Sequence, residues 1–414
     1  MASIPKKGRI RAVLFLIALT FFIRGLFSGT ENPPSSNKKQ TQSDESKIRI
    51  PANRDSLLRS AFIHPPFFPA GVSPAGLKKE DLTILPETQK RLEKLFNRYD
   101  PVVGAAVVMN ADNGNLLSLI SYSSDSKFLK KKNENKNWYI YNGFPAASIF
   151  KIITASALFE YSECSPETEF TVSGRLHTLY KNQINIDSKA TRRIIFRKAF
   201  ARSVNPIFGK IGLYNLGPGL LFETAENFWY NKEIPLAGGV PVGATIVADT
   251  GYQTAEIASG FNSSTTLSPV HGAMITASFV NGGKIISPSI SKKDTGDIKL
   301  LGRTISEYSS EMMRSLMKET VEKGTARKSW KKIRYGRNFR KMIYGGKTGS
   351  LDSESPKGRC DWFTGFCADT TTGRKYSVAV VTVHDQYWTV RSAYLAAEAI
   401  ISAFNETEPV EKTP

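Results

Sequence analysis

The chain has 414 residues, of which 41% are hydrophobic and 22% are charged, a composition ordinary for a globular protein with a sizeable core. Its formal net charge of +19 suggests nucleic acid as a first candidate partner. The sequence contains no zinc-finger spacing, basic zipper or RNA-binding aromatic signature, so we expect no nucleic-acid partner.

The N-terminal segment predicts export from the cytoplasm. Residues 1–11 are basic, and an apolar run follows at 12–23. This run has signal-peptide length, but if it continues through Phe27, with Arg24 reaching the interface, it nearly spans a bilayer. We favour an uncleaved signal anchor at 1–29 that fixes the protein to the inner membrane, with a cleaved signal peptide as the alternative. In both cases the rest of the chain would be periplasmic.

The elements that follow are predicted from composition and periodicity. Residues 30–97 comprise a flexible linker rich in proline and serine and a short helix, whose pattern covers 87–99. Two buried strands lie within 101–121 around an Ala-Asp-Asn-Gly turn. A charged loop at 125–141 separates this strand pair from a mostly helical stretch at 149–280.

The last part of the chain alternates between helix and strand patterns. It contains a predicted helix at 306–324, strands at 342–350, 361–368 and 375–384, and a final helix at 392–404. This order predicts an α+β fold, in which helices flank an antiparallel sheet. The predicted domain comprises residues 98–406, with sheet segments at 98–124 and 300–406, a helical subdomain inserted at 145–290, and a tail at 407–414.

The stretch "FPAASIFKIITASALFEY" places Ser148 and Lys151 on one face at the start of an apolar helix. Burial lowers the pKa of a lysine, and the positive end of a helix dipole acts in the same direction. The free amine would then act as a base that activates the serine hydroxyl, while the Ser148 backbone N–H faces an oxyanion. The alternative is an N-cap serine followed by a lysine that extends to solvent.

Two later motifs strengthen the catalytic interpretation. "ARSVNPIFGKIG" contains Ser203 and Asn205 in the pattern Ser-x-Asn, and "YGGKTGSLD" contains Lys347, Thr348, Gly349 and Ser350. Ser-x-x-Lys, Ser-x-Asn and Lys-Thr-Gly, in this order, form the motif set of the penicillin-recognising serine acyltransferases.

The resemblance extends beyond these motifs. "GAAVVMNADNGNLLSLIS" is similar to the opening strands of that family, and "VEKGTARK" resembles the Gly-Thr segment before its Lys-Thr-Gly strand. "DWFTGFCADTTTGRKYSVAVVTVHD" resembles the Trp-Phe-x-Gly strand and the hairpin after it. Over roughly residues 98–404, the chain resembles the transpeptidase domain of a penicillin-binding protein, whose fold is shared with serine β-lactamases.

The resemblance implies roles for the motif residues. Ser148 would attack the D-Ala-D-Ala carbonyl of a peptidoglycan stem peptide, with Lys151 as its base. Ser203 would relay the proton to the leaving amine, and Asn205 would hold the substrate amide. The remaining roles fall on the Lys-Thr-Gly strand: charge from Lys347 beside the substrate carboxylate, a hydrogen bond to that carboxylate from Thr348, close approach at Gly349, and the Ser350 N–H in the oxyanion hole.

The resemblance also implies partners and leaves alternatives open. β-Lactam antibiotics would be further ligands, other cell-wall synthesis proteins are candidate partners, and no metal or organic cofactor is implied. The leading expectation is an anchored D,D-transpeptidase. A D,D-carboxypeptidase, a serine β-lactamase and a non-catalytic scaffold of a cell-wall complex are the alternatives. Ser350 stands where long transpeptidases often have threonine, so the choice of acceptor is open.

Two basic runs, at 188–203 and 323–341, each lead into a motif. They are predicted to form a positive rim for an anionic cell-wall polymer or for acidic lipid head groups. A solvated face is the simpler alternative. The three cysteines, Cys164, Cys360 and Cys367, have no pairing that the sequence can decide.

Overall fold

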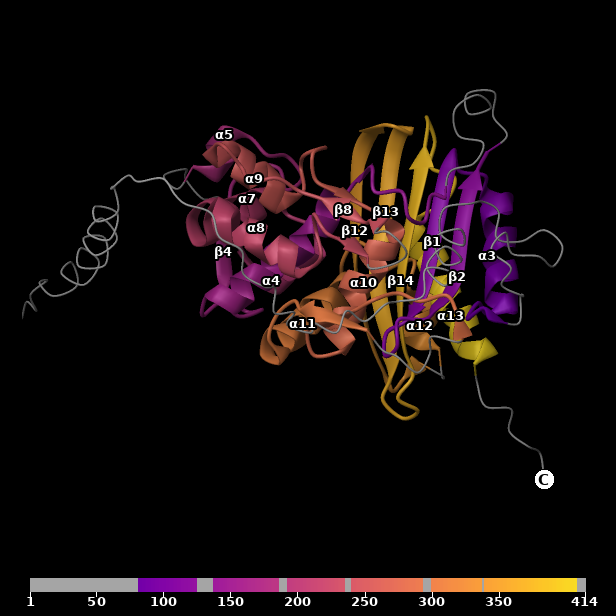
Figure 1. Ribbon diagram of the computed structural model, residues 1–414. Helices are drawn as coiled ribbons and strands as arrows, with labels where there is room; N and C mark the ends of the chain where they lie inside the picture. Colours follow the sequence, from indigo (N-terminus) through magenta and orange to yellow (C-terminus); the bar gives the residue numbers. More distant parts are fainter. Residues whose placement is uncertain are drawn as a thin grey trace, which may run out of the picture. The chain divides into compact units, whose positions relative to one another are not determined.

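The computed structural model describes residues 81–124, 137–185, 192–234, 240–292, 299–336 and 339–407. In these residues a five-stranded antiparallel sheet is covered by helices on both faces (Figure 1). The predicted anchor at 1–29 and most of the predicted linker lie outside the described residues. Within the described part, no helix combines the length and the apolar character needed to cross a membrane.

The sheet pairs strands from the two ends of the described chain. Its strand order is β12-β13-β14-β1-β2, and every neighbouring pair is antiparallel. The strands are β1 (Val103–Asn110), β2 (Leu116–Ser123), β12 (Met342–Glu354), β13 (Lys357–Asp369) and β14 (Lys375–His384). The predicted α+β class with an antiparallel sheet is thus confirmed. β12 and β13 are longer than predicted because their ladder continues to the pair Glu354 and Lys357.

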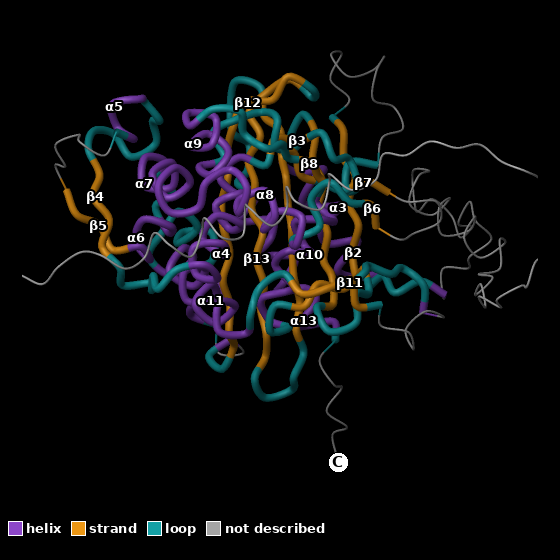
Figure 2. The backbone as a smooth tube through the Cα atoms, turned by 60° about the vertical axis from the view of Figure 1, so that its left-hand side comes forward, coloured by secondary structure: helices purple, strands orange, loops and turns teal. Residues whose placement is uncertain are grey.

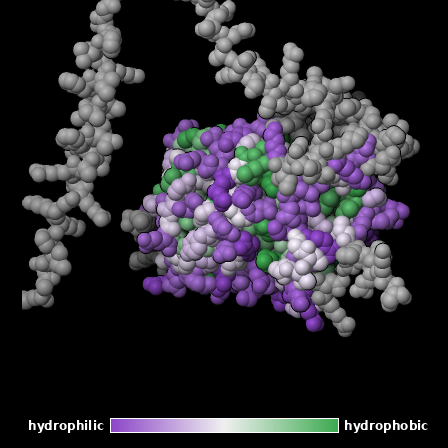
Figure 3. Space-filling model, turned by 60° about the horizontal axis from the view of Figure 1, so that its bottom comes forward, coloured by the Kyte–Doolittle hydropathy of each residue, from purple (hydrophilic) through white to green (hydrophobic). Residues whose placement is uncertain are grey.

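Both faces of the sheet are buried, which explains why its strands read as continuous apolar runs. Val107 and Val381 lie in one hydrophobic cluster, whereas Val108 and Val380 lie in another. Helices α10 (Pro269–Val280) and α11 (Glu307–Glu322) pack on the first face, and α3 (Pro86–Tyr99) and α13 (Ser392–Glu406) pack on the second. Figure 2 shows the same layers from another side. The face of the molecule in Figure 3 is mostly hydrophilic, with small hydrophobic patches among the hydrophilic residues.

Local capping positions several of these helices. The hydroxyls of Ser268 and Ser306 accept hydrogen bonds from the N–H groups of His271 and Ser309, in the first turns of α10 and α11. Such N-caps typically stabilise a helix by about 1 kcal/mol. The predicted helix at 306–324 is therefore confirmed, with its bounds at Glu307–Glu322.

The segment between β2 and β12 is richer in short strands than predicted. Its helical elements are η2 (Ala147–Phe150), α4 (Lys151–Tyr161), α5 (Lys181–Ile184), α6 (Phe196–Ala201), α7 (Asn205–Lys210), η3 (Ile211–Leu216), α8 (Gly217–Asn227), α9 (Gly251–Ser259), α10, α11 and α12 (Lys331–Tyr335). Its strands are β3 (Phe144–Pro145), β4 (Glu169–Val172), β5 (Arg192–Ile195), β6 (Glu233–Ile234), β7 (Val240–Pro241), β8 (Gly243–Ala244), β9 (Thr266–Leu267), β10 (Lys284–Ile286) and β11 (Leu300–Arg303). Strands of two to four residues are too short to show a period in the sequence.

The cysteines, which all lie within the described residues, form no disulfide bonds that would stabilise the fold. Cys360 and Cys367 both lie on β13 and are buried, and Cys164 is partly buried. All of these thiols are free. Burial raises the pKa of the Cys360 thiol to about 12, so this side chain behaves as an unreactive apolar group.

Candidate functional site

Ser148 lies in a tight turn rather than in a regular α-helix. Residues Ala147–Phe150 form the single 3₁₀ turn η2, and α4 begins at Lys151. Ala147 has a φ of 49°, which is unfavourable for a residue with a side chain. Backbone strain of this kind often occurs at functional sites because the surrounding structure must hold it in place.

The turn is held from behind by Gly260, the residue that ends α9. Gly260 has a φ of +63°, and a Cβ placed on it would lie 1.9 Å from the Ala147 carbonyl oxygen. Only glycine therefore allows the two backbones to approach this closely. As a result, the end of α9 fixes the turn from which the Ser148 hydroxyl projects.

The Lys151 side chain is fully buried and joins three parts of the chain. Its Nζ lies 2.9 Å from the Ser148 Oγ and 2.7 Å from the Asn205 Oδ1, and it also contacts the backbone carbonyl of Ser259. The Phe208 ring lies 5.5 Å from the nitrogen. Lys151 is thus surrounded by neutral acceptors and an aromatic ring, with no ion pair to a carboxylate within the described residues.

This environment favours the free amine. Burial, followed by repulsion from the charge of Lys347, holds the pKa of Lys151 well below its usual value. A neutral amine has two N–H donors and one lone pair. It can donate to Asn205 and Ser259 while its lone pair accepts the hydrogen of the Ser148 hydroxyl. The geometry therefore suits a proton acceptor placed beside the hydroxyl.

A second buried lysine lies on β12. The Nζ of Lys347 donates to the Ser203 Oγ at 3.1 Å and to the Thr348 carbonyl at 2.8 Å, and it lies 5.6 Å from the Phe200 ring. Burial lowers the pKa of Lys347 to about 7. Ser203 itself has a φ of 58°, so strained backbone positions occur beside Ser148 and at Ser203.

Asn205 begins α7 and is held at both ends of its side-chain amide. Its Oδ1 accepts from Lys151, while its Nδ2 donates to the His177 carbonyl at 2.9 Å. These two contacts determine which way the amide points, because an N–H of the Lys151 amine donates to the amide oxygen, and the His177 carbonyl can only accept, from the NH₂ group.

Strand β12 passes directly beside the Ser148 turn. A Cβ placed on Gly349 would lie 3.2 Å from the backbone nitrogens of both Ser148 and Ile149, so this approach requires glycine or a small shift. Thr348 precedes Gly349 on the strand, and its hydroxyl hydrogen-bonds to that of Thr325. Ser350 follows and is exposed, at the edge of the sheet.

The structure thus brings the residues of all three motifs together. Ser148, Lys151 and Asn205 form one hydrogen-bonded group, and Lys347 and Ser203 form a second. Three further groups belong to the site and were not predicted as site residues from the sequence: the Ser259 carbonyl, Gly260 and Thr325. Only Thr325 had a sequence signal, because it follows Gly324 in the stretch "VEKGTARK".

Comparison with known proteins defines the class of protein to which this chain belongs. The family model described as "Penicillin binding protein transpeptidase domain" matches residues 104–404, and the chain belongs to this family. The resemblance inferred from the motifs is therefore confirmed. Over 327 residues the chain is 23% identical to penicillin-binding protein 3 of Bacillus subtilis (strain 168). This alignment covers 69% of this chain and 46% of that relative. The chain thus spans about half the length of the curated relative that it matches.

Solved structures agree with the fold. The D,D-transpeptidase domain of a peptidoglycan glycosyltransferase from Eggerthella lenta superposes with a TM-score of 0.62 at 18% identity, covering 84% of this chain and 90% of that chain. Penicillin-binding protein A from M. tuberculosis, described as an imipenem acyl-enzyme complex, gives a TM-score of 0.60 at 19% identity, covering 78% and 79%. At these identities the likeness establishes the fold alone.

Proposed function

We propose that this protein is a serine D,D-transpeptidase that cross-links peptidoglycan stem peptides through an acyl-enzyme on Ser148. The observation that carries the proposal is the buried amine of Lys151, placed 2.9 Å from the Ser148 hydroxyl and depressed in pKa. The membership of the transpeptidase family supports it. The protein would act in the periplasm, fixed to the inner membrane by residues 1–29.

The first half-reaction forms the acyl-enzyme. Lys151 takes the proton of Ser148, and the Oγ attacks the carbonyl carbon of the penultimate D-Ala. The N–H groups of Ser148 and Ser350 would hold the oxyanion of the tetrahedral intermediate. The peptide bond then breaks, and the terminal D-Ala leaves with a proton that is relayed through Ser203.

The second half-reaction transfers the acyl group. An amine of a second stem peptide attacks the ester carbonyl, its proton passes to the enzyme, and the Ser148 oxygen leaves and regains its hydrogen. Asn205 would orient the substrate amide. Lys347 and Thr348 would bind the terminal carboxylate of the donor. Charge-assisted contacts of this kind are stronger than neutral hydrogen bonds.

The test is covalent labelling of the full-length chain with a fluorescent penicillin. Wild type should form a lasting adduct, and Ser148→Ala should form none, because the nucleophile has been removed. Ser156→Ala is the matched control, since Ser156 is buried on α4, the helix that follows the Ser148 turn, and its hydroxyl has no hydrogen-bond partner in the described structure. This control should be labelled like wild type.

The lifetime of the label separates the alternatives. An adduct that clears within seconds would indicate a serine β-lactamase. A lasting adduct together with release of D-Ala to water alone would indicate a carboxypeptidase. A wild-type chain that is never labelled would contradict the proposal and favour a non-catalytic scaffold.

The two lysines also predict the pH dependence of acylation. The rate should rise with pH as Lys151 loses its proton, and it should fall again above a pH of about 7 as Lys347 loses the charge that attracts the substrate carboxylate. The second-order rate constant for penicillin acylation, measured between pH 5 and pH 10, checks this. A rate that stays constant from pH 7 to pH 10 would contradict the role of Lys347.

A further inference from the structure

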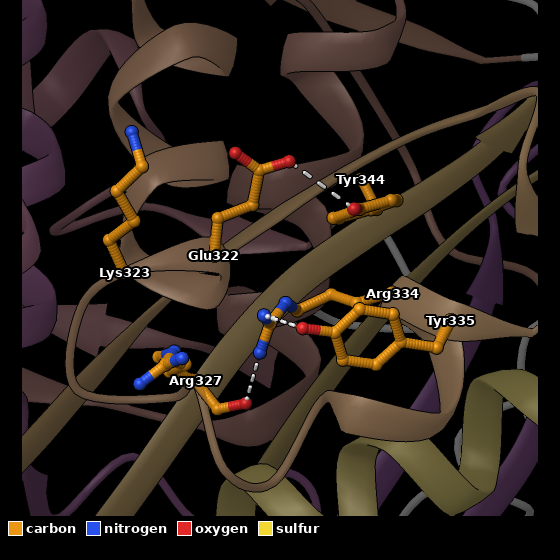
Figure 4. Close-up of a pocket in the computed structure, with 6 residues that line it drawn as sticks. All are labelled: Glu322, Lys323, Arg327, Arg334, Tyr335 and Tyr344. Carbon is orange, nitrogen blue, oxygen red and sulfur yellow. Dashed lines mark hydrogen bonds between the residues drawn. The ribbon is translucent and has the colours of Figure 1, made fainter.

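A cavity of about 580 Å³ lies outside the group of motif residues described above (Figure 4). It is formed by the end of α11, the segment that follows it, the end of α12, and strand β12. Its lining residues are Glu322, Lys323, Arg327, Arg334, Tyr335 and Tyr344. We call it the basic pocket, because it contains three cationic side chains and one carboxylate. None of the roles proposed above uses it.

The guanidinium of Arg334 is held in place without a carboxylate. It donates to the Arg327 carbonyl at 2.9 Å and to the Tyr335 hydroxyl at 3.0 Å, and it lies 4.9 Å from the Tyr335 ring. Figure 4 shows both hydrogen bonds within the cavity. A guanidinium has five donors in a planar fork, so several N–H groups of Arg334 stay available for a ligand.

The single carboxylate of the pocket is already engaged. Glu322 accepts a hydrogen bond from the Tyr344 hydroxyl at 3.4 Å and pairs with Lys318 at 3.7 Å. Among the described residues, neither Arg327 nor Arg334 has a carboxylate within salt-bridge distance. Other cations of the same basic run differ, because Lys332 pairs with Glu398 at 2.5 Å. The predicted positive rim is thus partly neutralised at Lys332, whereas both arginines of the pocket keep an uncompensated charge.

The pocket lies along the same strand as the position that would bind the substrate carboxylate. Tyr344 and Thr348 lie four residues apart on β12, so they share one face and their Cα atoms are about 13 Å apart. Thr325, which hydrogen-bonds to Thr348, lies between Lys323 and Arg327 in the sequence. The basic pocket therefore lies farther along β12 than the proposed donor site, and the segment that contains Thr325 contributes to both.

The direction along β12 identifies the group that would occupy the pocket. The proposed acyl group lies at Ser350, and the leaving D-Ala lies toward Lys347 and Thr348. From Thr348, β12 continues toward Tyr344. This direction leads away from the acyl group, on the side from which the D-Ala would leave. The attacking amine must approach from this same side, because acyl transfer is the reverse of donor cleavage with a different amine.

We propose that the basic pocket binds a carboxylate of the acceptor peptide and so selects an anionic acceptor for the acyl-enzyme. This inference rests on the proposed transpeptidase function. Arg327 and Arg334 would bind the carboxylate, whereas the charge of Lys323 is already paired with Glu319 at 3.4 Å. A planar guanidinium fork suits a carboxylate, which it can bind through two parallel hydrogen bonds.

The acceptor pair for the test differs in one carboxylate. The first peptide is L-alanyl-γ-D-glutamyl-L-lysine, whose glutamyl α-carboxylate can lie up to roughly 14 Å from the attacking side-chain amine when the peptide is extended. The second is the same peptide with that carboxylate amidated. Both are also made with diaminopimelate in place of lysine. The donor is a thioester of acylated D-alanine, and transfer by the full-length chain is measured as kcat/KM for each acceptor.

We expect wild type to prefer the free carboxylate at least about 10-fold. Arg327→Gln and Arg334→Gln should each reduce this preference, and together they should abolish it. Lys328→Gln is the matched control, because Lys328 is exposed in the same run but does not line the pocket. Every variant should be labelled by fluorescent penicillin at the wild-type rate, which also shows that it is folded.

Other outcomes would overturn the proposal. Normal penicillin labelling with equal use of both acceptors would refute the acceptor role while leaving the proposed function intact. If the two arginines were instead required for retention on a phosphate-bearing wall polymer, the pocket would belong to that polymer. A wild-type chain that neither reacts with penicillin nor consumes the thioester would refute the transpeptidase function itself, and the acceptor role with it.

Discussion

Replacing Lys151 with methionine should slow the acylation of Ser148 by a penicillin by about 10³-fold, within the range that a general base contributes. Methionine keeps the length and apolar stem of the side chain but has no lone pair that can take the hydroxyl proton. The chain should still fold, because the substitution removes a buried amine without leaving a charge unpaired. Stopped-flow or gel-based acylation kinetics measure the rate, and thermal unfolding checks the fold.

Lys210→Met is the matched control for this variant. Lys210 lies at the end of α7 in the same region, and partial burial lowers its pKa as well, yet it makes no contact with Ser148. Its replacement should leave the acylation rate unchanged. If Lys151→Met reacted as fast as Lys210→Met, the role of the Lys151 amine as a base would be wrong.

Replacing Gly260 with alanine should both destabilise the protein and disable the site. The new Cβ would lie 1.9 Å from the Ala147 carbonyl oxygen, and the backbone is in the left-handed region. Strain and displacement together should reduce the free energy of unfolding by roughly 3 kcal/mol. The Ser148 turn must shift to relieve the clash, and a displacement of about 1 Å at a reacting group can reduce the rate about 10²-fold.

The chain supplies a control that separates strain from clash. Gly373 has a φ of +75° in the turn between β13 and β14, but a Cβ placed on it would meet nothing within 4 Å. Gly373→Ala should therefore cost only about 1 kcal/mol and leave acylation intact. The free energy of unfolding and the rate of penicillin acylation, measured for both variants, separate the effect of strain from that of the clash. Equal effects of the two substitutions would show that the contact between Gly260 and Ala147 is unimportant.

The sequence predicted the sheet well because its strands carry strong signals. The apolar runs around 103–110 and 375–384 are long, and both become central strands buried on two faces. The terminal helix was predicted at 392–404 because its apolar residues recur with helical spacing, and it corresponds to α13. By contrast, α12 was missed, since a helix of five residues within a basic run has no room for a period.

The candidate site was predictable through its side chains and not through its backbone. Ser148, Lys151 and Lys347 stand in recognisable motifs, and the structure places them together. The Ser259 carbonyl could not be predicted, because every residue has such a group and only tertiary packing brings this one to Lys151. The positive φ of Ala147 was equally hidden, since no glycine marks the turn.

The two buried lysines have a consequence for how such a chain can change over time. Each is an amine enclosed in the interior, and within the described residues neither is matched by a carboxylate that would make its burial favourable. Substituting either one with an apolar residue would remove the cost of burying an amine but would leave its hydrogen-bond acceptors unpaired, so the fold should survive the change. Selection for a folded chain alone would therefore not preserve the site, and a folded, chemically inert descendant is only one substitution away.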